Sequence, residues 1–152
     1  MMEDGSNTLT VKELRAIVND IEDLLSEVYK TDTSISQKID SILTGSDKEF
    51  INRIIGGELP QDPDLLSSKL TSLLHELKNL PRIRITVAFE PTSAFVREIK
   101  DFLDNLNKGD MSILEIVIDN EIIAGMKLEY KGLFRDFSVG SRVSSMLLET
   151  KL

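Results

Sequence analysis

The fold is decided by residues 113–147, which read ILEIVIDNEIIAGMKLEYKGLFRDFSVGSRVSSML. The stretch opens with an apolar, mostly β-branched run from Ile113 to Ile118. Such a run favours a strand buried on most of both faces, and periodicity alone also allows a buried helical turn. Residues 126–130 then alternate apolar and polar side chains, as half-buried strands do. A turn at Lys131-Gly132 predicts that the chain folds back as a hairpin.

The same stretch ends with a predicted helix. Ser138 is a plausible N-cap, and four apolar residues recur behind it at helical spacing: Val139, Val143, Met146 and Leu147. Earlier in the stretch, Asp119-Asn120 is a turn signal. Gly125 stands where a strand begins, so it marks a bulge or a close approach of another backbone. The stretch is therefore expected to form a compact unit of strands and one closing helix.

Composition places the chain among soluble globular proteins. Its 152 residues are enough for one domain or two small ones, with 41% hydrophobic and 29% charged residues. It has no apolar run of the ~20 residues that cross a bilayer. The acidic, polar start does not resemble a signal or transit peptide, and the absence of cysteine fits a cytoplasmic protein.

The charge is unevenly distributed. Residues 1–80 hold 8 Lys and Arg against 15 Asp and Glu, whereas residues 81–152 hold 10 against 11. This acidic balance argues against nucleic acid as a partner, since phosphate binding needs a basic surface. The difference between the halves suggests two modules with different neighbours.

The first half predicts four helices. The first and longest begins after Thr10, which forms a capping box with Glu13, and extends to about Lys30. The second follows a capping box of Ser34 and Gln37 and is expected to stop at Gly45. The third is expected to open with a box of Ser46 and Glu49 and to end at Gly56-Gly57. The fourth is capped by Asp62, with Pro63 at its first position, and ends before Pro81.

From Arg82 the hydrophobic period changes from helical to alternating, which predicts a strand over residues 82–87. A helix follows Thr92-Ser93, with an apolar face formed by Phe95, Val96, Ile99, Phe102, Leu103 and Leu106. The predicted fold class is α+β: a small N-terminal helical bundle over residues 1–80, then an α/β sandwich over residues 81–152. The sandwich has the order strand, helix, strand, hairpin, helix. The first eight residues are predicted to be disordered.

No motif predicts catalysis, a metal or a cofactor. His75, the single histidine, has no nucleophile or orienting carboxylate in a recognisable motif beside it, so it is interpreted as a residue at the surface or at the boundary of the core. Four carboxylates near the end of the chain match no metal-ligand spacing: Glu115, Asp119, Glu121 and Asp136. Gly56-Gly57 follows a helix, whereas a phosphate loop precedes one, so it is interpreted as a C-cap.

One apolar surface has two interpretations. The stripe of the first helix includes Leu14, Ile17, Val18, Ile21 and Leu25. It is either core of the small bundle or part of a groove that receives a partner helix, and the sequence favours neither interpretation over the other. The apolar residues Val143, Met146 and Leu147 of the predicted last helix are candidates for the same kind of interface.

Residues 82–148 resemble the delta subunit of F-type ATP synthases, the family of the oligomycin-sensitivity-conferring protein. The segment IRITVAFEPTSAFVREI resembles that family's first strand and helix. Ile118-Asp119 is similar to its acidic turn, and Ala124-Gly125 to the pair that begins its hairpin. Asp136, Ser138, Val139 and Arg142 resemble its D-x-S-V-x-x-R signature.

The resemblance implies a non-catalytic peripheral-stalk (stator) subunit on the cytoplasmic face of the membrane, without membrane insertion. In that family the helical domain holds alpha subunits of the catalytic head, and the second domain holds the b subunit. The helical half here is shorter than the family's N-terminal bundle. Two alternatives stay open: an unrelated α+β adaptor that binds helical partners, and a small enzyme with an unrecognised site.

Overall fold

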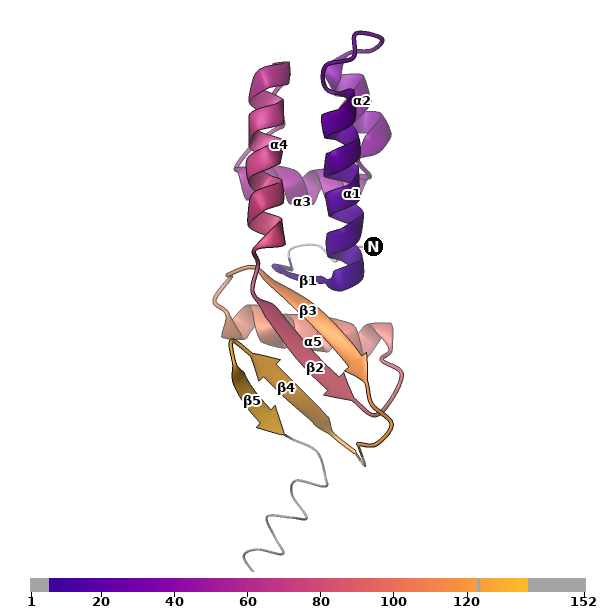
Figure 1. The fold of residues 1–152 in the computed structure, drawn as a ribbon, viewed down its shortest axis with the longest axis vertical. Helices are drawn as coiled ribbons and strands as arrows, with labels where there is room; N and C mark the ends of the chain where they lie inside the picture. The colour runs from indigo at the N-terminus through magenta and orange to yellow at the C-terminus, as the bar shows by residue number, and fades with distance from the viewer. Residues whose placement is uncertain (1–5, 123, 137–152) are drawn as a thin grey trace, which may run out of the picture. The chain divides into compact units, whose positions relative to one another are not determined.

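The computed structural model describes residues 6–122 and 124–136, and Figure 1 follows them along the chain. The elements in chain order are β1 (Thr8–Thr10), α1 (Val11–Glu27), α2 (Ile35–Ile42), α3 (Gly45–Ile55), α4 (Pro63–Lys78), β2 (Arg82–Val87), α5 (Ser93–Leu106), β3 (Ser112–Ile118), β4 (Met126–Tyr130) and β5 (Leu133–Asp136). They form two compact units, a helical unit (Val11–Leu80) and a sheet unit (Asn7–Thr10 with the chain from Pro81 onward). The predicted mixed α and β class, with helices first and the sheet after them, is confirmed. The predicted last helix lies outside the described residues.

The helical unit is built on two long helices, α1 and α4, which lie side by side and are connected through the shorter α2 and α3 (Figure 1). Their facing surfaces are apolar at helical spacing, so packing them together removes one continuous stripe from water. The buried residues of this core include Ile17, Ile21 and Leu24 of α1, Ile51 of α3, and Leu66, Leu70, Leu73 and Leu77 of α4. The expected arrangement of two long helices and two short ones is what the structure has.

Three of the predicted helix ends are confirmed in atomic detail. The Ser34 hydroxyl accepts a hydrogen bond from the Gln37 backbone N–H, and the Gln37 side chain accepts one from Ser34 N–H, both at 3.2 Å. At the start of α4, the Asp62 carboxylate accepts from Leu65 N–H at 2.9 Å, with Pro63 as the first helical residue. Gly56 ends α3 with φ of 77°, a left-handed conformation that glycine adopts without a Cβ clash.

The predicted start of α3 was wrong. Gly45 was expected to stop α2, but it is the first residue of α3, and α2 already ends at Ile42. Thr44 is the N-cap of α3 and makes no side-chain capping bond, so the predicted box of Ser46 and Glu49 does not open this helix. The reason is the backbone: Lys48 N–H donates to the Thr44 carbonyl at 2.9 Å, which closes the first turn two residues earlier.

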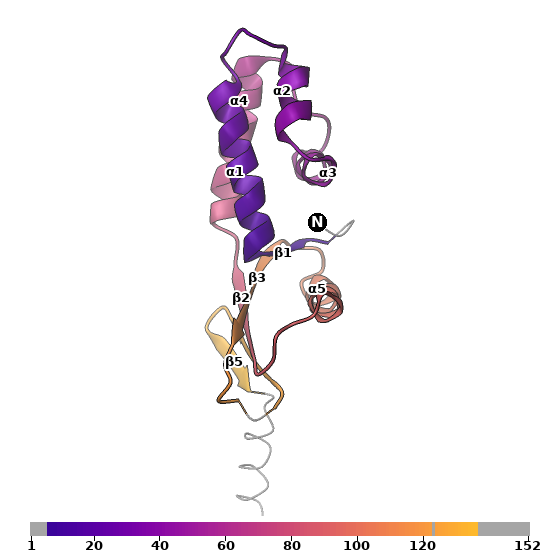
Figure 2. The same ribbon diagram turned by 90° about the vertical axis from the view of Figure 1, so that its right-hand side faces the viewer.

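The sheet unit contains one mixed five-stranded sheet with the order β1-β3-β2-β4-β5. β2 and β3 are parallel and are connected by α5, which lies across one face of the sheet (Figure 2). β4 pairs antiparallel with β2 and with β5. Lys131 and Gly132 connect β4 to β5 with φ of 49° and 75°, the two positive values that a tight two-residue hairpin turn requires. The predicted hairpin is therefore confirmed.

The N-terminal strand β1 was not predicted. Thr8–Thr10 pairs parallel with Ser112–Leu114, more than a hundred residues along the chain. The Thr8 hydroxyl donates to Asp104 Oδ1 of α5 at 2.6 Å, and the Asn7 side-chain amide donates to the Gly109 carbonyl at 2.9 Å. A three-residue strand whose partners are this distant leaves no periodic signal in its own sequence.

The second correction concerns β3, which was expected to be buried on most of both faces. Its first three residues are buried, but Val117 and Ile118 at its end are 37% and 43% exposed. The cause is the length of β1, which covers β3 only as far as Leu114 and leaves the rest as a free sheet edge. The core beneath α5 is formed by Ile83, Ile85, Val87, Ile99, Leu103 and Leu114.

Candidate partner-binding surfaces

Three of the signature residues, Asp119, Ala124 and Gly125, lie in the connection between β3 and β4, and Asp136 lies in strand β5. Asp119 accepts a hydrogen bond from Glu121 N–H through its side chain at 2.9 Å, and its own N–H donates to the Val87 carbonyl at 2.8 Å. It is therefore the turn residue that the sequence predicts. Gly125 has φ of 91° directly before β4, and Ala124 beside it is half-buried. Asp136 is the last residue of β5 and pairs in register with Lys127. Ser138, Val139 and Arg142 lie outside the described residues.

The candidate interface on α1 divides into a buried and an accessible part. Leu14, Ile17 and Ile21 are buried in the structure, with exposed fractions of 9% or less. Val18 and Leu25 are half-buried and keep some surface in contact with solvent. The core interpretation therefore describes the first three residues, and any partner of α1 would contact the other two. The remaining candidates, Val143, Met146 and Leu147, lie outside the described residues.

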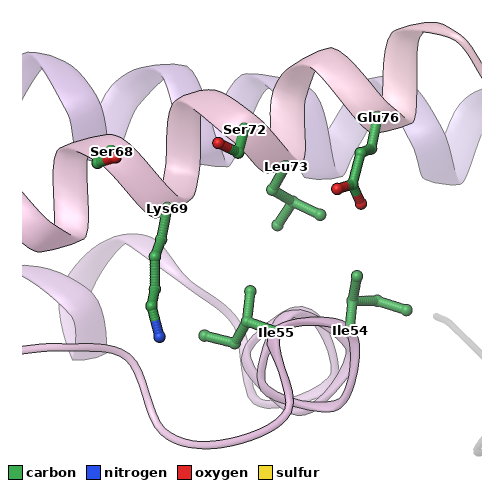
Figure 3. Close-up of a pocket in the computed structure, with 7 residues that line it drawn as sticks. All are labelled: Ile54, Ile55, Ser68, Lys69, Ser72, Leu73 and Glu76. Atoms are coloured by element: carbon green, nitrogen blue, oxygen red, sulfur yellow. The ribbon is translucent and has the colours of Figure 1, made fainter.

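A groove lies between the end of α3 and one face of α4 (Figure 3). Its volume is about 220 Å³, and its lining residues are Ile54, Ile55, Ser68, Lys69, Ser72, Leu73 and Glu76. Figure 3 shows Lys69, Leu73 and Glu76 extending from α4 toward the two isoleucines. The small side chains of Ser68 and Ser72, one turn apart, leave space between the helices. The sequence patterns do not predict this groove. The only indication in the sequence is the pair of small serines on a helix that is otherwise rich in leucine.

Lys38 of α2 is a buried cation that closes the end of α1. Its side chain is 4% exposed, and its ammonium group donates to the Glu27 carbonyl at 2.8 Å and to the Lys30 carbonyl. The last carbonyls of a helix have no partners within the helix, and a cation there also interacts favourably with the helix dipole. Because α1 has no basic residue in its own last turn, Lys38 supplies this charge from the next helix.

Two carboxyl groups meet where α1 packs near the first turn of α3. Asp47 is 9% exposed, and its side chain shares a hydrogen bond with Asp20. Burial, then the Asp47 carboxyl group and the charge of Asp23, raise the pKa of Asp20 to about 6. Like charges held this close disfavour double ionisation, so the pair retains a proton well above the usual pH for aspartate.

The sheet face opposite α5 is polar and charge-balanced. Arg84 of β2 lies between Glu115 of β3 and Glu129 of β4, with nitrogen–oxygen distances of 3.1 and 3.9 Å. All three side chains are partly exposed, so each ion pair contributes little to the free energy of unfolding. The pairs do place a positive charge between two negative ones on this face. Both carboxylates that neighbour Arg84 therefore belong to strands of the same sheet.

The structure does not gather the candidate chemical residues into one site. His75 is exposed near the end of α4, where its carbonyl accepts from the Asn79 amide at 2.8 Å. Glu115 pairs with Arg84, while Asp119 caps its own turn. Within residues 6–122 and 124–136, no group of three or more His, Cys, Asp or Glu side chains is placed to hold a metal ion. Over the same residues, no helix has the length and apolar character to span a membrane.

Comparison with known proteins identifies the family. Residues 63–148, more than half of the chain, match the family described as ATP synthase delta (OSCP) subunit. The chain is also 29% identical over 90 residues to a protein of Methylobacterium radiotolerans named ATP synthase subunit delta. That alignment covers 59% of this chain and 42% of the relative, so the chain spans less than half of the relative's length.

Among solved structures, the chain is similar to one in the cryo-EM structure of the Toxoplasma gondii mitochondrial ATP synthase hexamer. The TM-score is 0.44 and the identity 14%, over 92% of this chain and 88% of that chain. The family match confirms the resemblance seen in residues 82–148 and extends it to the start of α4. The chain belongs to the ATP synthase delta (OSCP) subunit family.

Proposed function

We propose that this protein is a non-catalytic stator subunit of an F-type ATP synthase, which connects the catalytic head to the b-subunit stalk. The observation that carries the proposal is the family match, which covers α4 and runs through the sheet unit to residue 148. A stator has to resist the torque of the rotor, and this requires tight interfaces and no reactive group. We propose that the protein acts as a peripheral component on the cytoplasmic face of the membrane.

For the sheet unit, we propose the stalk as partner. The conformation of the hairpin region depends on Gly125, since φ of 91° is strained for residues with a Cβ. The residues that follow β5 carry the family's signature, Ser138, Val139 and Arg142, and the apolar side chains Val143 and Met146. We therefore assign stalk binding to the end of the chain.

For the helical unit, we propose an amphipathic segment of the alpha subunits as partner. The groove of Ile54, Ile55 and Leu73 supplies apolar contact, and Lys69 and Glu76 supply polar contacts along its α4 side. Residues 1–80 carry an excess of seven negative charges, from 8 Lys and Arg against 15 Asp and Glu. Electrostatic complementarity therefore favours a partner segment with positive charge.

Co-purification tests the assignment. The tagged full-length protein is expected to capture both the catalytic head and the b subunit from detergent-solubilised membranes. A Val143→Glu and Met146→Glu double variant is expected to lose the b subunit and to retain the head. Val117→Glu, an exposed residue of β3, is the matched control and should retain both. Capture of neither complex by the wild-type protein would contradict the proposed function, and retention of the b subunit by a folded double variant would contradict the assignment to the chain end.

A further inference from the structure

The helical segment Val11–Leu80 is inserted between two strands of the sheet unit. Thr10 is the last residue of β1 and Val11 is the first residue of α1, so that strand continues directly into the first helix. At the other end of the segment, Leu80 is followed by the sheet unit, which resumes at Pro81. Both ends of the helical segment are therefore attached to the sheet unit.

The two attachments lie at nearly the same level of the sheet. β1 and β2 pair with the two sides of β3, and both run parallel to it. Thr10, where β1 ends, pairs with Leu114, and Arg82, where β2 begins, pairs with Ile113. Neighbouring strands are about 4.8 Å apart, so the two attachments are separated by about 10 Å across β3. Because two points hold the segment, free rotation remains only about the line that joins them.

Neither attachment contains a flexible linker. No residue lies between β1 and α1. After α4, the Asn79 N–H donates to the Glu76 carbonyl at 3.1 Å, and the Pro81 carbonyl already accepts from Ile113 N–H of β3 at 2.8 Å. Only Leu80 separates the last turn of the helix from the sheet, and the ring of Pro81 restricts the backbone of Leu80. Flexible linkers, in contrast, are longer and rich in glycine or serine.

Strand β1 has only three residues, and Asp104 of α5 strengthens its attachment. The Asp104 carboxylate accepts from the Asn7 N–H at 3.2 Å through one oxygen and from the Thr8 hydroxyl at 2.6 Å through the other. The Ser112 N–H of β3 also donates to the Asn7 carbonyl at 3.2 Å. Hydrogen bonds to an ionised carboxylate are stronger than those between neutral groups. Detachment of β1 from β3 would therefore break the strongest bonds that this short strand makes.

We propose that the two attachments act together as a hinge that restricts the rotation of the helical unit relative to the sheet unit. Bending about the line between Thr10 and Pro81 stays possible, whereas twisting about other axes requires β1 or the start of β2 to leave β3. Asp104 keeps the β1 attachment closed. The inference concerns the motion of this chain and does not depend on the proposed stator function. Under that function, a component that carries torque needs a connection that resists twisting.

Insertion of a flexible Gly-Ser-Gly-Ser segment at one attachment at a time tests the proposal. Four such residues span about 11 Å on average, which relaxes one attachment and leaves the pairings of β1 and β2 in place. One full-length variant has the insertion between Thr10 and Val11, and a second has it between Leu80 and Pro81. The matched control has the same insertion between Gly57 and Glu58, two exposed residues of the loop after α3.

The distance between two spin labels measures the range of relative rotation. The protein has no cysteine, so Leu65→Cys in the helical unit and Leu133→Cys in the sheet unit place one label on each. These positions are 51% and 67% exposed. Double electron–electron resonance gives the width of the distance distribution. We expect an insertion at either attachment to broaden this distribution at least about twofold, because the added residues behave as a random coil, and the control insertion to leave it unchanged.

Three results would overturn the proposal. The first is a distribution in the protein without an insertion that is as broad as in the insertion variants. The second is broadening by the insertion between Leu80 and Pro81 alone, since the β1 attachment would then add no restriction. The third is equal broadening by the control insertion.

Asp104→Ala tests the role of the carboxylate, with Asp101→Ala at an exposed position of the same helix as the matched control. In Asp104→Ala, the Ser112 amide should exchange at least about tenfold faster and the distance distribution should broaden. Neither should change in Asp101→Ala. Circular dichroism shows whether Asp104→Ala is folded, and Thr8→Val, which removes only the hydroxyl bond, replaces it if it is not. Unchanged exchange of Ser112 in the folded variant would contradict the role of Asp104.

Discussion

The two units of this protein bury their cores through different kinds of contact. The helical unit packs short stretches of chain against each other, and its helix ends are fixed by residues three or four positions apart, such as Ser34 with Gln37. The sheet unit depends on distant pairings, since Thr8 bonds to Asp104 across 96 residues. The helical unit also has an excess of carboxylates over basic side chains. In the sheet unit, two carboxylates form ion pairs with Arg84. The contrast indicates that the two units respond differently to mutation and to pH.

The largest expected effect comes from the centre of the sheet unit. Ile85 of β2 is 1% exposed and belongs to the core beneath α5. Ile85→Ala should lower the free energy of unfolding by about 2–5 kcal/mol, because it leaves a cavity between paired strands and the helix. Val117→Ala, at an exposed position of β3, should change it by only about 0.5 kcal/mol. Urea denaturation followed by circular dichroism measures both, and equal effects would contradict the assigned core.

In the helical unit, the next largest effect on stability is expected from a buried charged side chain, Lys38. Lys38→Met keeps much of the buried side-chain volume but removes the ammonium group from the Glu27 and Lys30 carbonyls. Leaving such acceptors unsatisfied costs about 1–3 kcal/mol of unfolding free energy. Lys48→Met, which removes an exposed ion pair with Asp40, is the control and should cost well under 1 kcal/mol. The same denaturation experiment checks the pair, and a stable Lys38→Met variant would contradict the role of Lys38.

Substitutions at two glycines of the helical unit distinguish the effect of backbone strain from the effect of packing. A Cβ added at Gly45 or at Gly56 would have no neighbouring atom within 4 Å, so space is available at both positions. Of the two, only Gly56 has a positive φ. Gly56→Ala should therefore destabilise the unit by about 1–2 kcal/mol. Gly45→Ala, in the first turn of α3, should stabilise it by about 0.5–1 kcal/mol. Thermal unfolding of the two variants measures the difference, and effects of the same sign would contradict the assigned backbone conformations.

The Asp20 and Asp47 pair should make the helical unit sensitive to pH. Since the folded state raises the pKa of Asp20 to about 6, protonated Asp20 is favoured by folding. Its contribution to stability is fully present below about pH 4 and is lost as the pH rises through 6. Asp20→Asn should therefore raise the free energy of unfolding at pH 7.5 and change it little at pH 4. Denaturation at both values measures this, and a variant equally affected at both would contradict the assignment.

The smallest expected effect is on the open face of the sheet. Arg84→Met removes two exposed ion pairs and leaves Glu115 and Glu129 on either side of an apolar residue. Exposed pairs of this kind contribute about 0.2–1 kcal/mol each, and salt screens them. The destabilisation should therefore shrink in high salt, as denaturation at two salt concentrations will show. A loss above about 2 kcal/mol would indicate that this face is a closed interface.

The contrast also explains how far the sequence predicts the structure. Capping signals at Ser34, Asp62 and Gly56 gave the helix boundaries because each involves residues within one turn. The error at Gly45 arose because a glycine between two helices fits the end of one as well as the start of the next. In the sheet unit, β1 escaped prediction because its signal lies in the distant strand with which it pairs.

For the candidate surfaces, the sequence predicted which side chains are apolar but not which of them stay exposed. Ile17 and Phe102 both belong to amphipathic stripes, yet the first is fully buried and the second is 54% exposed. The difference depends on what lies opposite each helix, which periodicity does not specify. Lys38 was likewise unremarked, because a lysine is buried only where a tertiary neighbour supplies acceptors.

The proposed stator function, in which the protein transmits force and performs no chemistry, is tested most directly with ATP synthase that has been depleted of the protein. Membrane vesicles stripped of the protein should lose proton-driven ATP synthesis, while the catalytic head continues to hydrolyse ATP. Adding the purified full-length protein should restore synthesis. Restoration together with the b subunit in the recovered complex is the predicted result. Unimpaired synthesis without the protein, or loss of hydrolysis by the head itself, would contradict the claim.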